Sequence, residues 1–151
     1  MNTNKAIYFD MDGTIADLYG VSGWLDKLQS GDATPYATAR PLVKLNTLAR
    51  KLNTLQRDGY TLGIVSWLAK NNDANYDQKV TEAKKKWLNN HLKSVKWDEM
   101  HIVKYGTPKE EVVNYPQGIL FDDEDRNRNN WSGKAYRETE IMEVLNNLKV
   151  S

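Results

Sequence analysis

Short apolar runs that alternate with helical patterns are the feature that most constrains the fold of this chain. Five such runs, each bounded by polar or turn residues, are typical of buried strands. They cover residues 6–9, 62–65, 100–103, 118–121 and 134–136. Strands that alternate with helices indicate a parallel sheet with helices on both faces. We therefore expect an α/β fold.

Apolar residues at helical spacing predict the helices between these strands. One helix is expected over residues 41–59, with Pro41 at its first position and Gly59 at its exit. Others are expected over residues 76–92 and 138–148. The predicted core face of the first helix consists of Leu42, Leu45, Leu48, Ala49, Leu52 and Leu55.

Two further segments have weaker patterns. A short helix is expected after Thr107, with Thr107 as its N-cap residue and Pro108 in its first turn. Residues 15–40, called the flap segment here, have no clear strand. Within them, residues 21–28 are expected to form a short helix, and residues 31–35 a loop.

Length and composition exclude several classes of protein. At 151 residues the chain has the length of one domain. It has no cysteine, which excludes a disulfide framework and a cysteine-based metal site and fits a cytoplasmic protein. The first residues hold no signal-peptide core, and no stretch approaches the ~20 apolar residues of a membrane span.

The charge balance indicates no polyanionic partner. The net charge of +1 gives no sign of nucleic-acid or membrane binding. Lys84, Lys85 and Lys86 form a short basic run. We interpret this run as the solvated face of a helix rather than as a nucleic-acid patch.

Four polar features follow a predicted strand or precede a predicted helix. They are residues 10–14 (Asp-Met-Asp-Gly-Thr), Ser66, Lys109, and the pair Asp122 and Asp123. In open α/β sheets, ligands bind in the crevice outside the carboxyl ends of the strands. All four features are therefore expected to point into one crevice.

The acidic residues of this group predict a magnesium site. Two like charges ~4 Å apart repel by roughly 4 kcal/mol at an effective dielectric near 20, so Asp10, Asp12, Asp122 and Asp123 need protons or a hard cation. Oxygen ligands without histidine or cysteine favour Mg²⁺, which commonly takes a substrate phosphate as a further ligand. A carboxylate can then attack phosphorus as a nucleophile. The Ser66 hydroxyl and the Lys109 ammonium are expected to bind phosphoryl oxygens.

These motifs resemble those of the haloacid dehalogenase (HAD) superfamily. Residues 9–14 (Phe-Asp-Met-Asp-Gly-Thr) are similar to its first signature, and a serine, a lysine and an acid pair follow in the family's order. The resemblance implies a Rossmann-like three-layer sandwich with strand order 5-4-1-2-3, as a single domain of residues 1–151. The span between Asp10 and Ser66 is too short for a full cap domain, so we expect the flap segment to be a flap or minimal cap.

The resemblance also assigns roles to single residues. It implies that Asp10 is the nucleophile and Asp12 the general acid and base. Ser66 and Lys109 would bind phosphate. Asp123 would bind Mg²⁺ together with the Asp10 carboxylate and the Asp12 backbone carbonyl. Asp122 would assist through a water molecule or by contacting a metal ligand.

Some details of the family pattern leave alternatives open. The fourth signature often has an acid four residues after the metal ligand, where this chain has Asn127. Asn127 could bind the metal more weakly or hold a water, and it is also a candidate for contact with the substrate or for closure of the site. Lys104 is an alternative to Lys109 as the active-site lysine. Residues 109–113 and the acid pair bear a weaker likeness to the 5'(3')-deoxyribonucleotidase branch.

The predicted function is therefore hydrolysis of a small phosphorylated metabolite, such as a nucleotide. Tyr19, Trp24 and Trp67 could stack on an aromatic group of the substrate or close the site. One alternative is a phosphatase that processes nucleic-acid ends, although the near-neutral charge disfavours it. Another is a binding module that keeps the fold with little catalysis. A response-regulator receiver domain places its acid pair and lysine in a different order. The sequence indicates no oligomeric state.

Overall fold

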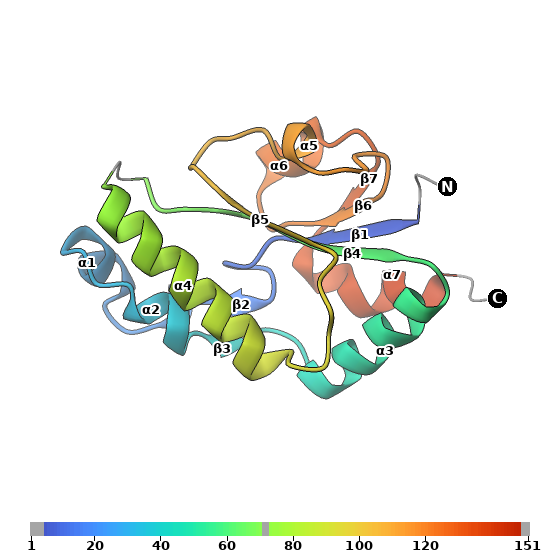
Figure 1. Ribbon diagram of the computed structural model, residues 1–151, viewed down its shortest axis with the longest axis horizontal. Coiled ribbons are helices and arrows are strands. Elements are labelled where there is room, and N and C mark those ends of the chain that lie inside the picture. The colour runs from blue at the N-terminus through green and yellow to red at the C-terminus, as the bar shows by residue number, and fades with distance from the viewer. Residues whose placement is uncertain (1–4, 71–72, 149–151) are drawn as a thin grey trace.

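A parallel sheet of five strands forms the centre of the protein, in the order β5-β4-β1-β6-β7 (Figure 1). The structure is a computed structural model that describes residues 5–70 and 73–148. The strands are β1 (Ala6–Phe9), β4 (Thr61–Trp67), β5 (Glu99–Val103), β6 (Ile119–Phe121) and β7 (Lys134–Tyr136). Every pairing between them is parallel, which confirms the predicted α/β class.

The numbers in this order differ from the predicted 5-4-1-2-3 because the chain forms two additional short strands. β2 (Ala16–Asp17) and β3 (Arg40–Pro41) pair antiparallel with each other and lie outside the main sheet. When only the strands of the main sheet are numbered along the chain, their order is 3-2-1-4-5. That is the predicted order read from the opposite edge.

Helices cover both faces of the sheet. Because successive side chains of a strand point to opposite faces, Ile7 and Phe9 belong to one core cluster, and Ala6 and Tyr8 to another. The first cluster is covered by α3 (Leu45–Arg57), α4 (Ala74–His91) and α7 (Ile141–Asn147). α5 (Lys109–Val112) and α6 (Asp125–Asn130) lie on the opposite side (Figure 1). β1 is therefore buried on both faces, which explains its continuous apolar run.

The predicted start of α3 at Pro41 is wrong. Pro41 pairs with Ala16 in the β2–β3 ribbon, and the helix begins only at Leu45. Leu42 is consequently 43% exposed and does not belong to the core face. Leu48, Leu52 and Leu55 are fully buried as expected, and Gly59, with φ +101°, ends the helix in the left-handed conformation.

The predicted N-cap of the short helix is also wrong. α5 begins at Lys109, and its N-cap residue is Pro108 rather than Thr107. The Thr107 hydroxyl donates instead to the carbonyl oxygen of Lys104 at 2.7 Å. The last predicted helix divides into a 3-10 turn, η2 (Glu138–Glu140), followed by α7.

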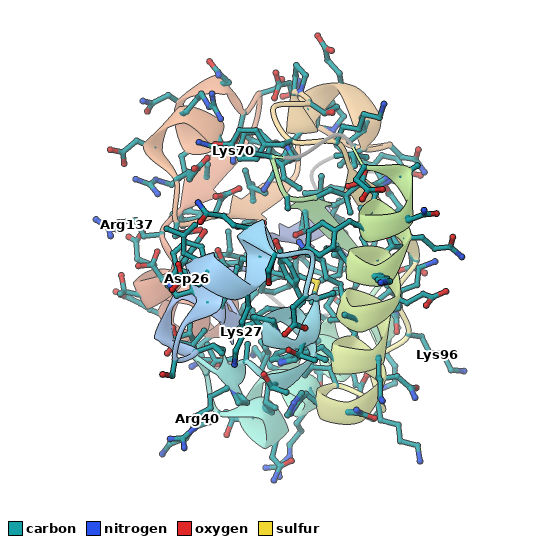
Figure 2. The ribbon with its side chains drawn as sticks, turned by 90° about the vertical axis from the view of Figure 1, so that its left-hand side faces the viewer. Asp26, Lys27, Arg40, Lys70, Lys96 and Arg137 are labelled. Atoms are coloured by element: carbon teal, nitrogen blue, oxygen red, sulfur yellow. The ribbon has the colours of Figure 1, made fainter. Side chains whose placement is uncertain are left out.

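The flap segment leaves and re-enters the main body through the β2–β3 ribbon. Between these strands lie η1 (Leu18–Gly20), α1 (Trp24–Gln29) and α2 (Thr34–Thr38), so the predicted loop over residues 31–35 ends at residue 33. Leu18 and Tyr36 pack in one cluster with Tyr76 and Val80 of α4. Viewed from this side, α2 lies beside α4, and α1 lies next to α2 (Figure 2). Among the described residues, no helix is both long and apolar enough to cross a membrane.

Candidate active site

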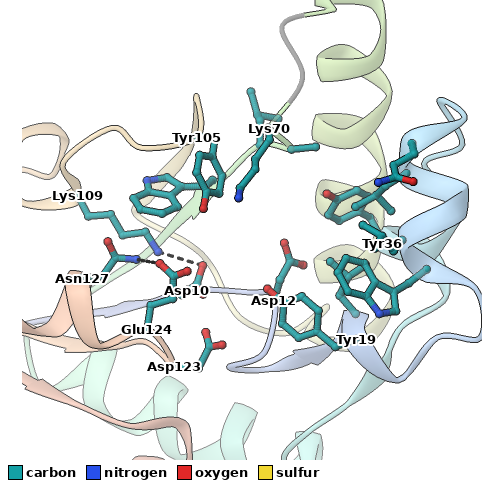
Figure 3. A pocket seen from close by; sticks show the side chains of 18 residues that line it. Asp10, Asp12, Tyr19, Tyr36, Lys70, Tyr105, Lys109, Asp123, Glu124 and Asn127 are labelled. Carbon is teal, nitrogen blue, oxygen red and sulfur yellow. Dashed lines mark hydrogen bonds and ion pairs between the residues drawn. The ribbon is translucent and has the colours of Figure 1, made fainter.

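A pocket of about 690 Å³ opens at the carboxyl ends of β1, β4 and β6. Asp10 follows β1 directly, Trp67 ends β4, and Asp122 and Asp123 follow β6. Figure 3 shows Asp10, Lys109 and Asn127 on one side of this pocket and Tyr19 and Tyr36 on the other. The topology therefore brings most of the predicted polar features to one place.

Three aspartates form a cluster that could hold a metal ion. Carboxylate oxygens of Asp10, Asp122 and Asp123 lie within 4.8 Å of one another. Burial, reinforced by the carboxylates of Asp10 and Asp122, raises the pKa of Asp123 to about 8. Burial and the Asp10 carboxylate likewise raise the pKa of Asp122 to about 6, although Lys109 opposes this shift. The cluster thus holds more negative charge than its protein surroundings stabilise, which is the condition that a bound cation relieves.

A tight turn after β1 shapes the cluster. The backbone N–H of Asp10 donates to Phe121 O at 2.9 Å and joins the turn to β6. The Thr14 hydroxyl lies 3.4 Å from Asp10 Oδ2 and 3.2 Å from Asp123 Oδ1, so one side chain contacts two of the three acids. Gly13 has φ +79° and lies against Asp123, which leaves no room for a side chain.

Lys109, not Lys104, contacts the acids. Its Nζ lies 2.6 Å from Asp122 Oδ2 and 3.1 Å from Asp10 Oδ1, and the side chain is 2% exposed. Burial alone would lower the pKa of Lys109, but the carboxylates of Asp10 and Asp122 outweigh it, and the net shift is upward. Lys104 is exposed, and its backbone carbonyl oxygen accepts hydrogen bonds from the hydroxyl and the backbone N–H of Thr107.

Asn127 contacts Asp122 and also lines the pocket, so it remains a predicted substrate or closure residue. Its amide Nδ2 donates to Asp122 Oδ2 at 3.1 Å and to Glu124 Oε2 at 3.3 Å. The backbone N–H of Glu124 donates to the other oxygen, Asp122 Oδ1, at 3.0 Å. Asp122 is fully buried and bonded through both oxygens, whereas Asp123 is partly exposed and lines the pocket.

Asp12 and Ser66 are joined by Lys84, a lysine predicted to lie on a solvated helix face. That assignment is wrong for Lys84, which is fully buried, although Lys85 and Lys86 are exposed. Lys84 Nζ donates to Asp12 Oδ2 at 2.9 Å and to Ser66 Oγ at 2.7 Å. Burial raises the pKa of Asp12, although the Lys84 ammonium opposes this shift. Ser66 is 1% exposed and does not line the pocket, whereas Asp12 does.

A signal for Lys84 is present in the sequence. Tyr76, Val80, Lys84 and Leu88 are spaced four residues apart, and all four are buried on one face of α4. A lysine at a core position of an amphipathic helix requires a buried acceptor. Its place within a run of three lysines conceals this pattern.

Aromatic side chains form much of the apolar lining of the pocket, which we call its aromatic wall. Tyr19 and Trp24 of the flap segment make an edge-to-face pair at 5.0 Å between ring centroids, and both line the pocket. Trp67 packs against Tyr105 at 4.9 Å, and its indole Nε1 donates to Thr107 O at 2.8 Å. Tyr19 and Tyr105 are among the few large apolar side chains exposed in the described part of the chain. An exposed aromatic wall suits a ligand with a flat or apolar portion.

A nearly buried carboxylate, a buried ammonium and a cluster of acids that could hold a metal ion thus share one pocket with aromatic side chains. Comparison of the sequence with protein-family models finds no match, and neither does comparison with curated proteins. A functional assignment therefore rests on the chemistry of the residues themselves.

Proposed function

We propose that this protein is a magnesium-dependent phosphomonoester hydrolase of the HAD type. The observation that carries this proposal is the position of Asp10, which lies 3.1 Å from the Lys109 ammonium and within 4.8 Å of the Asp122 and Asp123 oxygens. It lines the pocket but is only 7% exposed, as suits a nucleophile that bound substrate shields from water.

The reaction has two steps. An oxygen of the Asp10 carboxylate attacks phosphorus, the bond from phosphorus to the ester oxygen breaks, and the leaving oxygen takes a proton from the Asp12 carboxyl group. Water then attacks phosphorus of the aspartyl phosphate, and Asp12 takes the water proton. The acyl phosphate bond breaks, which releases inorganic phosphate and restores Asp10.

Two further residues support the charge that develops on phosphorus. The Lys109 ammonium already faces Asp10, so it lies beside the phosphoryl group that Asp10 would carry. The Ser66 hydroxyl lies buried behind the pocket lining, accepts a hydrogen bond from Lys84 and keeps its own hydrogen, which it would donate to a phosphoryl oxygen once substrate reaches the end of β4.

A divalent cation fits this donor set. Asp10 and Asp123, with the backbone carbonyl of Asp12, would hold it. Asp122 would support the site without binding the ion, through the Lys109 ammonium that it shares with Asp10. The site has four aspartates and two buried lysines, Lys84 and Lys109, so a divalent cation would balance the fully ionised groups. Oxygen ligands alone favour Mg²⁺, which when bound neutralises charge on the phosphoryl oxygens.

The substrate class follows from the pocket. Its aromatic wall, with Tyr19, Trp24, Trp67 and Tyr105, favours a phosphorylated metabolite with a flat organic portion, such as a nucleotide. A nucleic-acid end is disfavoured by the net charge of +1, because backbone binding needs a basic track.

The proposed function is tested by magnesium-dependent hydrolysis across a panel of phosphorylated metabolites. Activity should vanish in excess chelator and return with Mg²⁺. Asp10→Asn should lower the rate by orders of magnitude while the thermal unfolding curve stays cooperative. A freshly purified variant, checked for deamidation, that keeps the wild-type rate would refute the mechanism.

A further inference from the structure

Lys84 lies at a place in the core where an apolar residue would be expected. The buried residues of α4 on either side of it, Val80 and Leu88, belong to hydrophobic clusters. Trp87, less than one turn away, is fully buried and donates from Nε1 to Ala39 O at 2.7 Å. These contacts fix the helix backbone around Lys84, whose side chain is 0% exposed.

The Lys84 ammonium has three hydrogens, and the structure provides three acceptors. Besides Asp12 Oδ2 at 2.9 Å and Ser66 Oγ at 2.7 Å, Nζ donates to the backbone oxygen of Trp67 at 2.7 Å. A buried ammonium is costly unless its hydrogens have partners. Because each hydrogen has one, the position of Nζ is determined on all sides.

The three acceptors belong to two different elements. Ser66 and Trp67 lie in β4, a strand paired on both sides within the sheet. Asp12 lies in the turn after β1, where an isolated bridge to Ala16 is its only strand-like pairing among the described residues. The ammonium therefore joins a side chain on a turn to a rigid strand.

We propose that Lys84 is a positioning residue that holds the Asp12 carboxylate where the leaving oxygen of the substrate arrives. This role presupposes the proposed phosphatase function and adds to it a residue outside the pocket lining. Lys84 occupies Oδ2 of Asp12, so Oδ1 is the oxygen that exchanges a proton with the leaving group and later with water. Lys84 itself touches neither substrate nor metal.

If Lys84 positions Asp12, replacing Lys84 should lower kcat/KM by a factor that depends on the leaving group of the ester. A phosphate ester of an aliphatic alcohol needs a proton from Asp12 as its bond breaks, whereas the p-nitrophenolate of p-nitrophenyl phosphate leaves without one. The measurement is kcat/KM for both esters, because this ratio reports the steps up to transfer of the phosphoryl group to Asp10.

Lys84→Met should reduce kcat/KM for the aliphatic ester by about 100-fold and for p-nitrophenyl phosphate by less than about 5-fold. Lys85→Met, at the exposed neighbouring position of the same helix, is the matched control and should leave both values unchanged. Should methionine prevent folding, Lys84→Arg provides the same comparison, since its planar fork keeps the charge but does not match three acceptors around one nitrogen.

A double-mutant cycle separates positioning from simple structural support. In an Asp12→Asn background, Lys84→Met should cause no further selective loss on the aliphatic ester, because the residue it positions is already inactive. Equal losses on both esters, or a full additional loss in the Asp12→Asn background, would overturn the positioning role of Lys84. Neither outcome would affect the proposed phosphatase function. A wild-type protein without magnesium-dependent activity on either ester would overturn the proposed function, and this role with it.

Discussion

Gly13 lies directly against the carboxylate of Asp123, so that a Cβ atom at position 13 would stand 2.8 Å from Asp123 Cγ. The turn after β1 and the acid pair after β6 therefore pack so closely that no methyl group fits between Gly13 and Asp123. Asp123 is also the acid that the Thr14 hydroxyl contacts at 3.2 Å. The position of this carboxylate depends on the glycine at position 13.

Gly13→Ala should weaken Mg²⁺ binding by about 10- to 100-fold, because Asp123 must move to make room for the methyl group. Titration calorimetry with Mg²⁺ measures the change. Gly31→Ala is the matched control: Gly31 has φ +84°, close to the +79° of Gly13, but no atom lies within 4 Å of an added Cβ. Both variants should lose roughly 1 to 2 kcal/mol of stability from backbone strain. Equal magnesium affinities in the two variants would contradict this account of Asp123.

Much of this site follows from sequence because its residues are tied to buried strands. Asp10, Asp122 and Asp123 follow runs that are apolar over their whole length, and parallel strands bring their carboxyl ends to one edge. Lys109 could be preferred to Lys104 because it begins a helix after a proline, a local signal that does not depend on distant contacts.

The features that sequence patterns missed depend on tertiary contacts. Pro41 suits a helix start and an edge strand equally well, and its pairing with Ala16 decides between them. Lys84 resembles its exposed neighbours Lys85 and Lys86 until the acceptors on β4 are known. Residues more than fifteen positions away in the sequence therefore determine both the secondary structure at Pro41 and the burial of Lys84.

Without a divalent cation, stability should fall as pH rises. Asp123 has a pKa of about 8 in the folded protein, raised from the 3.8 of an ordinary aspartate, so the folded state binds a proton that the unfolded state releases. Such a group stabilises the fold fully below about pH 4, and this contribution is lost as pH rises to about 8. Thermal unfolding in chelator should therefore give a lower Tm at about pH 9 than at about pH 5.

Magnesium should reverse this trend, because it replaces the proton on the carboxylate cluster. The rise in Tm on adding Mg²⁺ should be larger at about pH 9 than at about pH 5, where protons compete for the same oxygens. Asp123→Asn is the control, since an amide has no proton to lose and the slope in chelator should flatten. A magnesium effect that is independent of pH would argue against binding at this cluster.

Lys109→Met should destabilise the protein by about 3 to 5 kcal/mol, because it leaves Asp10 and Asp122 buried without their counter-ion. Denaturant unfolding at near-neutral pH measures this loss, and activity should fall by orders of magnitude in the same variant. Lys104→Met removes the same charge from an exposed position five residues away and should change neither quantity. If Lys104→Met abolished activity and Lys109→Met did not, Lys104 rather than Lys109 would be the active-site lysine.

The flap segment contributes Tyr19 and Trp24 to the aromatic wall of the pocket, and the effect of this contribution on catalysis should depend on the size of the substrate. Trp24 packs edge-to-face on Tyr19, and both side chains line the pocket together with Asp10, Asp12 and Asp123. A small ester such as phenyl phosphate can reach Asp10 without filling this space, whereas a nucleoside monophosphate extends to the wall. Trp24→Ala should therefore lower kcat/KM for the nucleotide by about 10-fold more than for phenyl phosphate.

Closure of the flap segment over a bound ligand gives a second measurement, because its helices are short, α2 packs on α4, and α1 packs on α2 and η1. A phosphate analogue bound with Mg²⁺ should slow amide hydrogen exchange in α1 and α2 more than in α3, which is anchored in the main core through Leu48, Leu52 and Leu55. Leu42→Ala, which removes an exposed apolar side chain away from the pocket, is the control and should alter neither exchange nor substrate preference. Equal losses on both substrates after Trp24→Ala, together with unchanged exchange in α1 and α2, would mean that the segment is a fixed wall and that the site remains open during the reaction.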